Sequence, residues 1–153
     1  MIQQIFNPSE KASIAARILE DLPEWFGISE STGAYIEGCR DLPFWAAYDK
    51  LVPIGFLALK QTSPACAEVF VMGVLPEYHR TGVGRRLYGM FENFAREKGY
   101  SYVQVKTVRM GRYPVYDKTN RFYQAMGFQE LECFPALWDE WNPCQLYVKY
   151  IGG

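Results

Sequence analysis

The strongest structural signal in the chain lies in residues 74–87, which read Val74-Leu75-Pro76-Glu77-Tyr78-His79-Arg80-Thr81-Gly82-Val83-Gly84-Arg85-Arg86-Leu87. A strand ends here, a glycine-rich turn follows, and an amphipathic helix begins directly after the turn. The apolar side chains of this helix fall at positions 83, 87, 90, 91, 94 and 95, which places them in one continuous stripe, and Gly99 marks its end. This order predicts a helix that packs on a sheet.

The glycine-rich turn has the features of an anion-binding site. Amides at a helix start have no partner inside the helix, and glycines let a ligand approach the backbone closely. Arg80, Arg85 and Arg86 crowd this start, where the helix dipole disfavours cations unless an anion binds there. The alternative is that these arginines simply point into water. A Walker loop is excluded because no Gly-Lys-Ser or Gly-Lys-Thr occurs, and a Rossmann turn because Leu87 replaces its third glycine.

Hydrophobic periodicity and turn residues predict the remaining elements in the order β-α-α-β-β-β-α-β-α-β-β. The expected strands cover residues 2–6, 44–48, 54–59, 67–75, 102–108, 128–134 and 145–151, and the expected helices cover 8–22, 29–40, 83–99 and 119–126. Asn7 is the expected N-cap of the first helix, with Pro8 in its first position. The pattern indicates a mixed α/β domain that is antiparallel early and crosses over through helices later.

Length and composition limit the class of protein. With 153 residues, 49% of them hydrophobic, and a formal charge of −1, we expect one globular domain spanning residues 1–153. The charge is too small to predict binding to nucleic acid or to anionic membranes. No apolar run approaches the roughly 18 residues of a membrane span, and the first residues lack the features of a signal peptide. A cytoplasmic location is therefore expected.

The cysteines and the single histidine give no sign of metal or thiol chemistry. Four cysteines occur without a C-x-x-C pair, and only one histidine is present, so we expect no metal site. In the absence of a signal peptide, the cysteines are expected to be reduced and mostly buried. A nucleophilic pair of a cysteine with His79 is the less favoured alternative.

Two motifs resemble those of the GNAT family of N-acetyltransferases. Residues 79–84 are similar to the family's pyrophosphate loop, Gln/Arg-x-x-Gly-x-Gly/Ala, with His79 in the Gln/Arg place. Residues 122–128, Phe-Tyr-Gln-Ala-Met-Gly-Phe, are similar to its F-Y-x-x-x-G-F signature. The resemblance covers about residues 2–151, and the ending looks like that of a subgroup of uncharacterised bacterial members. It implies an α+β fold with a central, mostly antiparallel twisted sheet of about seven strands and flanking helices.

The resemblance also implies acetyl-CoA as the co-substrate and a set of residues that bind it. The expected binding residues are Met72, Val74, His79, Arg80, Thr81, Gly82, Val83, Gly84 and Arg85. The backbone amide of Met72 would polarise the thioester carbonyl, and a bulge at Gly73 would splay the strand from its neighbour. Many members carry a coenzyme-binding Asn seven residues before the tyrosine, where this chain has Tyr116; Asn120 is out of register.

Two residues match the family's catalytic positions. Glu68 corresponds to the general base of the histone-modifying members, and a period of two places it on one strand face with Phe70, Met72 and Val74. The alternative is an edge-strand carboxylate that faces water. Tyr123 is the expected general acid that protonates the leaving thiolate. Its alternative is a core tyrosine.

The expected function is transfer of an acetyl group from acetyl-CoA to a primary amine by direct attack. A non-catalytic acyl-CoA sensor or interaction module of the same fold is the alternative, because a fold does not imply a function. The acceptor stays open between a small amine and a peptide or protein amine. A C-terminal edge strand suggests a possible homodimer. Six aromatic residues are candidates for the acceptor pocket: Trp25, Trp45, Tyr113, Tyr116, Trp138 and Trp141.

Overall fold

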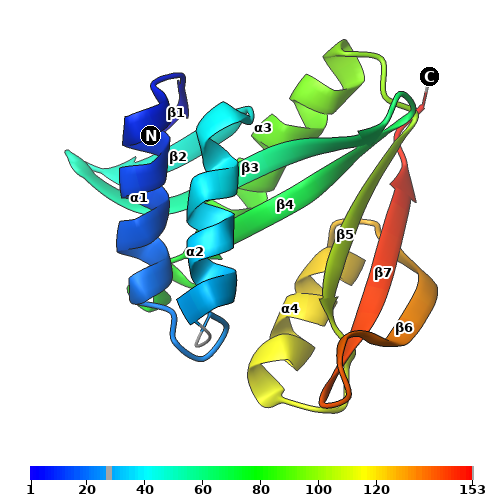
Figure 1. The fold of residues 1–153 in the computed structure, drawn as a ribbon. Helices are drawn as coiled ribbons and strands as arrows, with labels where there is room; N and C mark the ends of the chain where they lie inside the picture. The colour runs from blue at the N-terminus through cyan, green and yellow to red at the C-terminus, as the bar shows by residue number, and fades with distance from the viewer. Residues whose placement is uncertain (27–28, 153) are drawn as a thin grey trace.

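The computed structural model describes residues 1–26 and 29–152, which form one seven-stranded sheet with flanking helices (Figure 1). The strands are β1 (Ile2–Ile5), β2 (Phe44–Asp49), β3 (Val52–Ser63), β4 (Cys66–Val74), β5 (Tyr102–Val108), β6 (Gln129–Asp139) and β7 (Asn142–Tyr150). The helices are α1 (Pro8–Glu20), α2 (Ser29–Gly38), α3 (Val83–Glu97) and α4 (Pro114–Ala125), with short 3-10 helices η1 (Cys39–Asp41) and η2 (Pro76–Tyr78). The predicted order of strands and α-helices is confirmed.

The sheet has the order β1-β2-β3-β4-β5-β7-β6, and β4 and β5 are its parallel pair. The other neighbouring pairs are antiparallel, which confirms the expected mostly antiparallel sheet. The β4–β5 pairing covers only Cys66–Glu68 against Tyr102–Gln104, although both strands continue beyond it. The sheet therefore opens into two wings, β1–β4 and β5–β7, which diverge from Glu68 onward (Figure 1).

The helices cover opposite faces of the first wing. A Cβ added to Gly73 would contact Ile18 of α1 and Leu22 just after this helix, whereas one added to Gly55 would contact Leu87 of α3. Most of the stripe predicted for α3 packs against the sheet: Val83, Leu87, Phe91 and Ala95 are buried and Phe94 is half-buried, whereas Met90 is exposed. Figure 1 shows α1 and α2 in front of this wing and α3 behind it.

Local signals account for the helix starts. The side chain of Asn7 accepts a hydrogen bond from the Glu10 amide at 2.9 Å, which satisfies one free donor of α1 as predicted. The start of α4 was predicted wrongly at residue 119, because the helix begins at Pro114. Proline is well placed in a first helical position, since its missing N–H is not needed there.

The C-terminal hairpin is longer than predicted, and β6 is one edge of the sheet. The Asp139 carboxylate accepts hydrogen bonds from the amides of Trp141 and Asn142, both at 2.8 Å, which fixes the tight turn. Hydrogen bonding from the Asn142 side chain, helped by these two amides, holds the pKa of Asp139 below its ordinary value. Among the described residues, no helix is both long and apolar enough to cross a bilayer.

Candidate active site

The divergence of β4 from β5 leaves backbone groups of β4 without a strand partner. The amide of Leu75 donates to Ile54 of β3 at 2.9 Å. Because backbone direction alternates along a strand, Gly73 also faces β3, whereas Met72 and Val74 face the open edge. The contact of 2.7 Å between His79 Nε2 and the Val74 carbonyl agrees with this direction. The structure thus places both β4 residues of the predicted binding set at the opening.

The bulge in β4 lies at Phe70 and not at Gly73, so that prediction was wrong. Val71 pairs with Ala58 and Val69 with Leu59, which leaves Phe70 as the extra residue, whereas Gly73 stays in register with Phe56. Gly73 instead permits close packing, since a Cβ there would lie 3.0 Å from Leu22.

The bulge also changes which side chains share a face. The ring of Phe70 lies against Gly38 and Tyr35 of α2. The Met72 side chain lies against Gly84 of α3, on the opposite face. The expectation that Glu68 shares a face with Met72 and Val74 was therefore wrong, because the extra residue reverses the alternation. Glu68 stays with Phe70 on the α2 face.

The start of α3 offers backbone donors without a capping side chain. Gly82 is its N-cap and has φ of +88°, and no side chain caps the first turn within the described residues. Arg80 also has positive φ, at +66°, and the Thr81 hydroxyl donates to the Tyr78 carbonyl, so the turn is tightly folded. Arg80, Thr81, Gly82 and Arg85 are exposed, Gly84 is half-buried, and Val83 is buried. This turn has the free amides and open approach that an anion needs.

Trp25 lies between α1 and α2 and contacts α4 across the opening between the two wings. Its Nε1 donates to Thr119 Oγ1 of α4 at 3.2 Å, and its carbonyl accepts from the Tyr116 hydroxyl at 2.8 Å. Its ring meets that of His79 edge-on, with centroids 5.7 Å apart. Burial raises the pKa of Tyr116 to about 12, which keeps this donor protonated.

The other aromatic candidates for the acceptor pocket lie elsewhere. Trp45 is a core residue, 2% exposed, and packs on Phe94 of α3. Trp138 and Trp141 are exposed on the β6–β7 hairpin. Of the six, Trp25 and Tyr116 are therefore the pair that the structure brings to the opening, and Tyr113, exposed just before α4, packs edge-on against Tyr116 with ring centroids 6.1 Å apart.

Glu68 lies at the apex of the opening, where the β4–β5 pairing stops. Its side chain is nearly buried, and its Oε2 accepts from Gln104 Nε2 at 2.7 Å and pairs with Lys106 Nζ at 3.2 Å. Among the described residues, none donates a hydrogen bond to Oε1. Gln104 and Lys106 were missed from the sequence, since their place beside Glu68 depends on the parallel register of β4 and β5.

Tyr123 of α4 is buried between the rings of Phe122 and Phe128, at centroid distances of 5.4 and 5.6 Å. Burial raises its pKa well above the ordinary value. Its hydroxyl makes no hydrogen bond to any described residue. The phenol therefore stays protonated at neutral pH and can donate to a ligand.

Asn120 has a structural role, in agreement with its being out of register with the family's coenzyme-binding Asn. It is fully buried, and its Nδ2 donates to the carbonyls of Val108 at 2.8 Å and Tyr116 at 2.6 Å. Its Oδ1 accepts from the Tyr147 hydroxyl at 2.6 Å. The side chain thus ties α4 to β5 and β7.

We expect Asn120→Leu to lower the free energy of unfolding by about 2–4 kcal/mol, because it leaves the Val108 carbonyl buried without this partner and leaves the Tyr147 hydroxyl only its contact with Gln124 at 3.3 Å. Urea denaturation followed by circular dichroism measures the loss. Asn93→Leu, at an exposed position of α3, is the control and should change the value by less than about 0.5 kcal/mol. Equal stability of the two variants would contradict the structural role.

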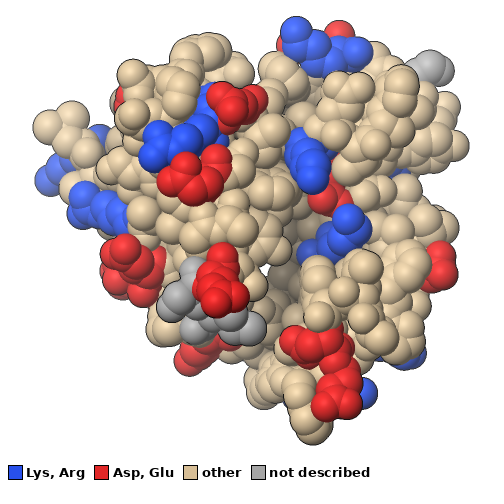
Figure 2. Space-filling view, in the orientation of Figure 1, with Lys and Arg blue, Asp and Glu red and all other residues tan. Residues whose placement is uncertain are grey.

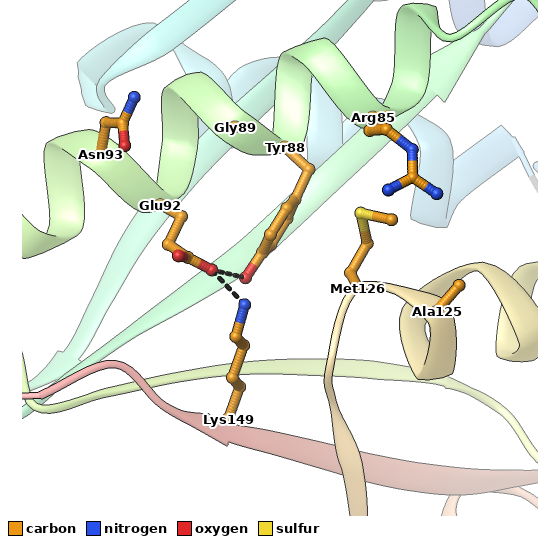
Figure 3. Close-up of a pocket in the computed structure, with 8 residues that line it drawn as sticks. All are labelled: Arg85, Tyr88, Gly89, Glu92, Asn93, Ala125, Met126 and Lys149. Carbon is orange, nitrogen blue, oxygen red and sulfur yellow. Dashed lines mark hydrogen bonds and ion pairs between the residues drawn. The ribbon is translucent and has the colours of Figure 1, made fainter.

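A pocket of about 270 Å³ lies on the α3 side of the sheet, between α3, the end of α4 and β7 (Figure 3). Arg85 and Met126 border one side of it. Glu92 accepts from Tyr88 at 2.7 Å and pairs with Lys149 at the other side. Burial alone would raise the pKa of Glu92, but its hydrogen bonds with Lys149, Tyr88 and Arg96 lower it below the ordinary value.

The cysteines are free thiols, and Cys39 and Cys144 are buried. Burial raises the pKa of Cys39 to about 12 and that of Cys144 to about 11, which disfavours the nucleophilic thiolate. Within residues 1–26 and 29–152, His79 contacts no cysteine, and no cluster of three or more His, Cys, Asp or Glu side chains has the geometry of a metal site.

Comparisons with known proteins agree with this geometry. The model of the Acetyltransferase (GNAT) domain family matches residues 40–130. An uncharacterized N-acetyltransferase of Chlorobaculum tepidum is 31% identical over 137 residues, which cover 87% of this chain and 81% of that protein.

Two solved structures show the same fold. An aminoglycoside 6'-N-acetyltransferase complexed with coenzyme A has a TM-score of 0.77 at 17% identity, covering 100% of this chain and 98% of that one. Ard1 from Thermoplasma volcanium has a TM-score of 0.79 at 18% identity, with the same coverage of 100% and 98%. The family match over more than half of the chain, together with the similar N-acetyltransferase, shows that this chain belongs to the GNAT acetyltransferase family.

Proposed function

We propose that this protein transfers an acetyl group from acetyl-CoA to a primary amine by direct attack. The observation that carries the proposal is the opening between β4 and β5, which has Glu68 at its apex and the free amides of α3 at its mouth. The similar aminoglycoside acetyltransferase has been solved with coenzyme A, which supports the choice of donor.

The α3 turn fits a pyrophosphate group, because its first amides are uncapped and Arg80 and Arg85 are exposed beside them. The open edge of β4 would align the rest of the coenzyme, with the Met72 amide donating to the thioester carbonyl. His79 Nε2 contacts the Val74 carbonyl, so binding of the coenzyme there would replace this contact with one to the coenzyme.

Glu68 supplies the base. An alkyl ammonium with a pKa near 10.4 is almost fully protonated at pH 7, so the base must remove a proton before the nitrogen can attack. Glu68 Oε1 receives no hydrogen bond from the described residues, whereas Oε2 contacts Gln104 and Lys106. A C–N bond forms as the C–S bond breaks, and the Tyr123 hydroxyl donates to the departing thiolate.

Calorimetric titration with acetyl-CoA, with ADP as control, tests the first half of the proposal. Release of free thiol with a panel of primary amines tests the second. Micromolar binding and amine-dependent thiol release are expected. Binding without release from any amine would instead identify a non-catalytic acyl-CoA module, and no binding at millimolar concentration would refute both.

Tyr123→Phe should lower kcat by about 10²-fold, because the thiolate leaves without a hydrogen-bond donor. Acetyl-CoA affinity and thermal stability should stay near wild type, since the hydroxyl makes no bond to a described residue. Tyr102→Phe, at an exposed position of β5, is the matched control. An unchanged kcat for Tyr123→Phe would remove Tyr123 as the acid.

A further inference from the structure

Two lysines flank the candidate base on the face that α1 and α2 cover. Lys60 of β3 lies directly opposite Glu68 in the β3–β4 register, and its Nζ lies 5.6 Å from the centroid of the Phe70 ring. Lys106 of β5 lies on the other side, with its Nζ 3.2 Å from Glu68 Oε2. Figure 2 shows a basic, an acidic and a second basic group one below another along the hollow of this face. The three side chains together carry one net positive charge.

The two oxygens of Glu68 have different surroundings. Gln104 and Lys106 both contact Oε2, whereas Oε1 receives no hydrogen bond from the described residues. An amine that binds Oε1 would share one carboxylate with the Lys106 ammonium, because Lys106 contacts Oε2 of the same group. Two contacts on one carboxylate suit a ligand whose nitrogen and anionic group are only one or two carbon atoms apart.

We propose that the acceptor is a small amine with a carboxylate beside its amino group, as in an α-amino acid, and that Lys106 binds the carboxylate and determines this specificity. The inference rests on the proposed function, because it assigns Glu68 to the amine. The rings of Tyr35 and Phe70, with centroids 5.4 Å apart, pack edge-on against each other on the α2 side of the site. The Lys106 side chain is about one-third exposed, so its ammonium is accessible to such a ligand.

The charges around the site oppose a polycationic acceptor. An aminoglycoside would bring several ammonium groups towards Lys60 and Lys106, and like charges placed together at an interface are unfavourable. Glu37 of α2 and Asp117 of α4 do not offset this repulsion, because each already has a partner. Glu37 pairs with Arg40 at 2.7 Å, and Asp117 accepts from the Gly111 amide at 2.8 Å. Lys106 would also favour the neutral, nucleophilic form of a nearby amine.

Initial rates of thiol release, measured with α-amino acids, their amides, spermidine and an aminoglycoside, test the proposal. Each acid and its amide share the same side chain, but the amide also lowers the pKa of the amino group, so the change of their ratio between wild type and a Lys106 variant isolates the carboxylate contact. We expect kcat/KM for at least one acid to exceed that of its amide by about tenfold or more, and to exceed that of both polycations. Spermidine and the aminoglycoside should be poor acceptors.

Lys106→Gln should lower the ratio of acid to amide by about tenfold or more relative to wild type, mainly by raising KM for the acid, whereas Lys106→Arg should keep most of the preference. A lysine that only positioned Glu68 would lower the rates with acid and amide equally. Lys118→Gln, at an exposed position of α4, is the control and should leave the ratio at the wild-type value.

Preference for amides or polycations, or a ratio that Lys106→Gln leaves unchanged, would overturn the inference while the N-acetyltransferase activity stands. Acetyl-CoA binding without turnover of any amine would have a different meaning, since it would refute the proposed function and the inference with it.

Discussion

Glu68→Gln should lower kcat/KM for the amine at pH 7 by about 10²–10⁴-fold, because a carboxamide cannot take the proton from the acceptor ammonium. The substitution keeps the shape of the side chain, and the amide oxygen can still accept from Gln104 and Lys106. Acetyl-CoA affinity and thermal stability should therefore stay near wild type. Steady-state kinetics with the best amine of the panel measure the effect.

The pH dependence of Glu68→Gln separates a lost base from a damaged site. Without a base, the reaction depends on the free amine, whose fraction rises tenfold per pH unit until its pKa near 10.4. The ratio of wild-type to variant rates should therefore shrink steadily from pH 7 to pH 9. Glu132→Gln, at an exposed position of β6, is the control. If Glu68→Gln matches wild type at pH 7, Glu68 is not the base.

The parts of the site that are local in sequence could be predicted. The turn before α3, its apolar stripe and the order of the elements follow from glycine positions and periodicity over a few turns of chain. The start of α4 was missed because the expected helix began only at residue 119, although Pro114 suits the first position of a helix.

The surroundings of Glu68 could not be predicted, since they depend on contacts between distant segments. Gln104 and Lys106 contact the carboxylate, and Lys60 lies opposite Glu68, through the registers of β5 and β3 against β4. The position of the bulge in β4 could not be predicted from the sequence either. Glycine was the only cue to it, yet Gly73 serves close packing and the extra residue is Phe70. The hydrogen bond between Trp25 and Thr119 of α4 joins residues that are 94 positions apart in the sequence.

Gly82→Val should weaken acetyl-CoA binding by about 10²–10⁴-fold, because it removes about two hydrogen bonds to charged phosphate oxygens worth 1.5–3 kcal/mol each. Gly82 has φ of +88°, which a β-branched residue rarely adopts, so valine should turn the first amides of α3 away from their present directions. A Cβ at this position would meet no atom within 4 Å, so the effect is one of backbone conformation and not of steric blockage.

Gly82→Asn is the matched variant, because asparagine tolerates the left-handed conformation that valine avoids. It should bind acetyl-CoA much more tightly than Gly82→Val when both are titrated calorimetrically. Both variants should keep the α3 stripe buried against the sheet and therefore remain folded. At saturating acetyl-CoA, kcat of Gly82→Val should recover towards wild type, because Glu68 and Tyr123 lie on other elements. If valine and asparagine bind equally well, the amides of this turn do not hold the coenzyme, and its phosphates must be bound elsewhere.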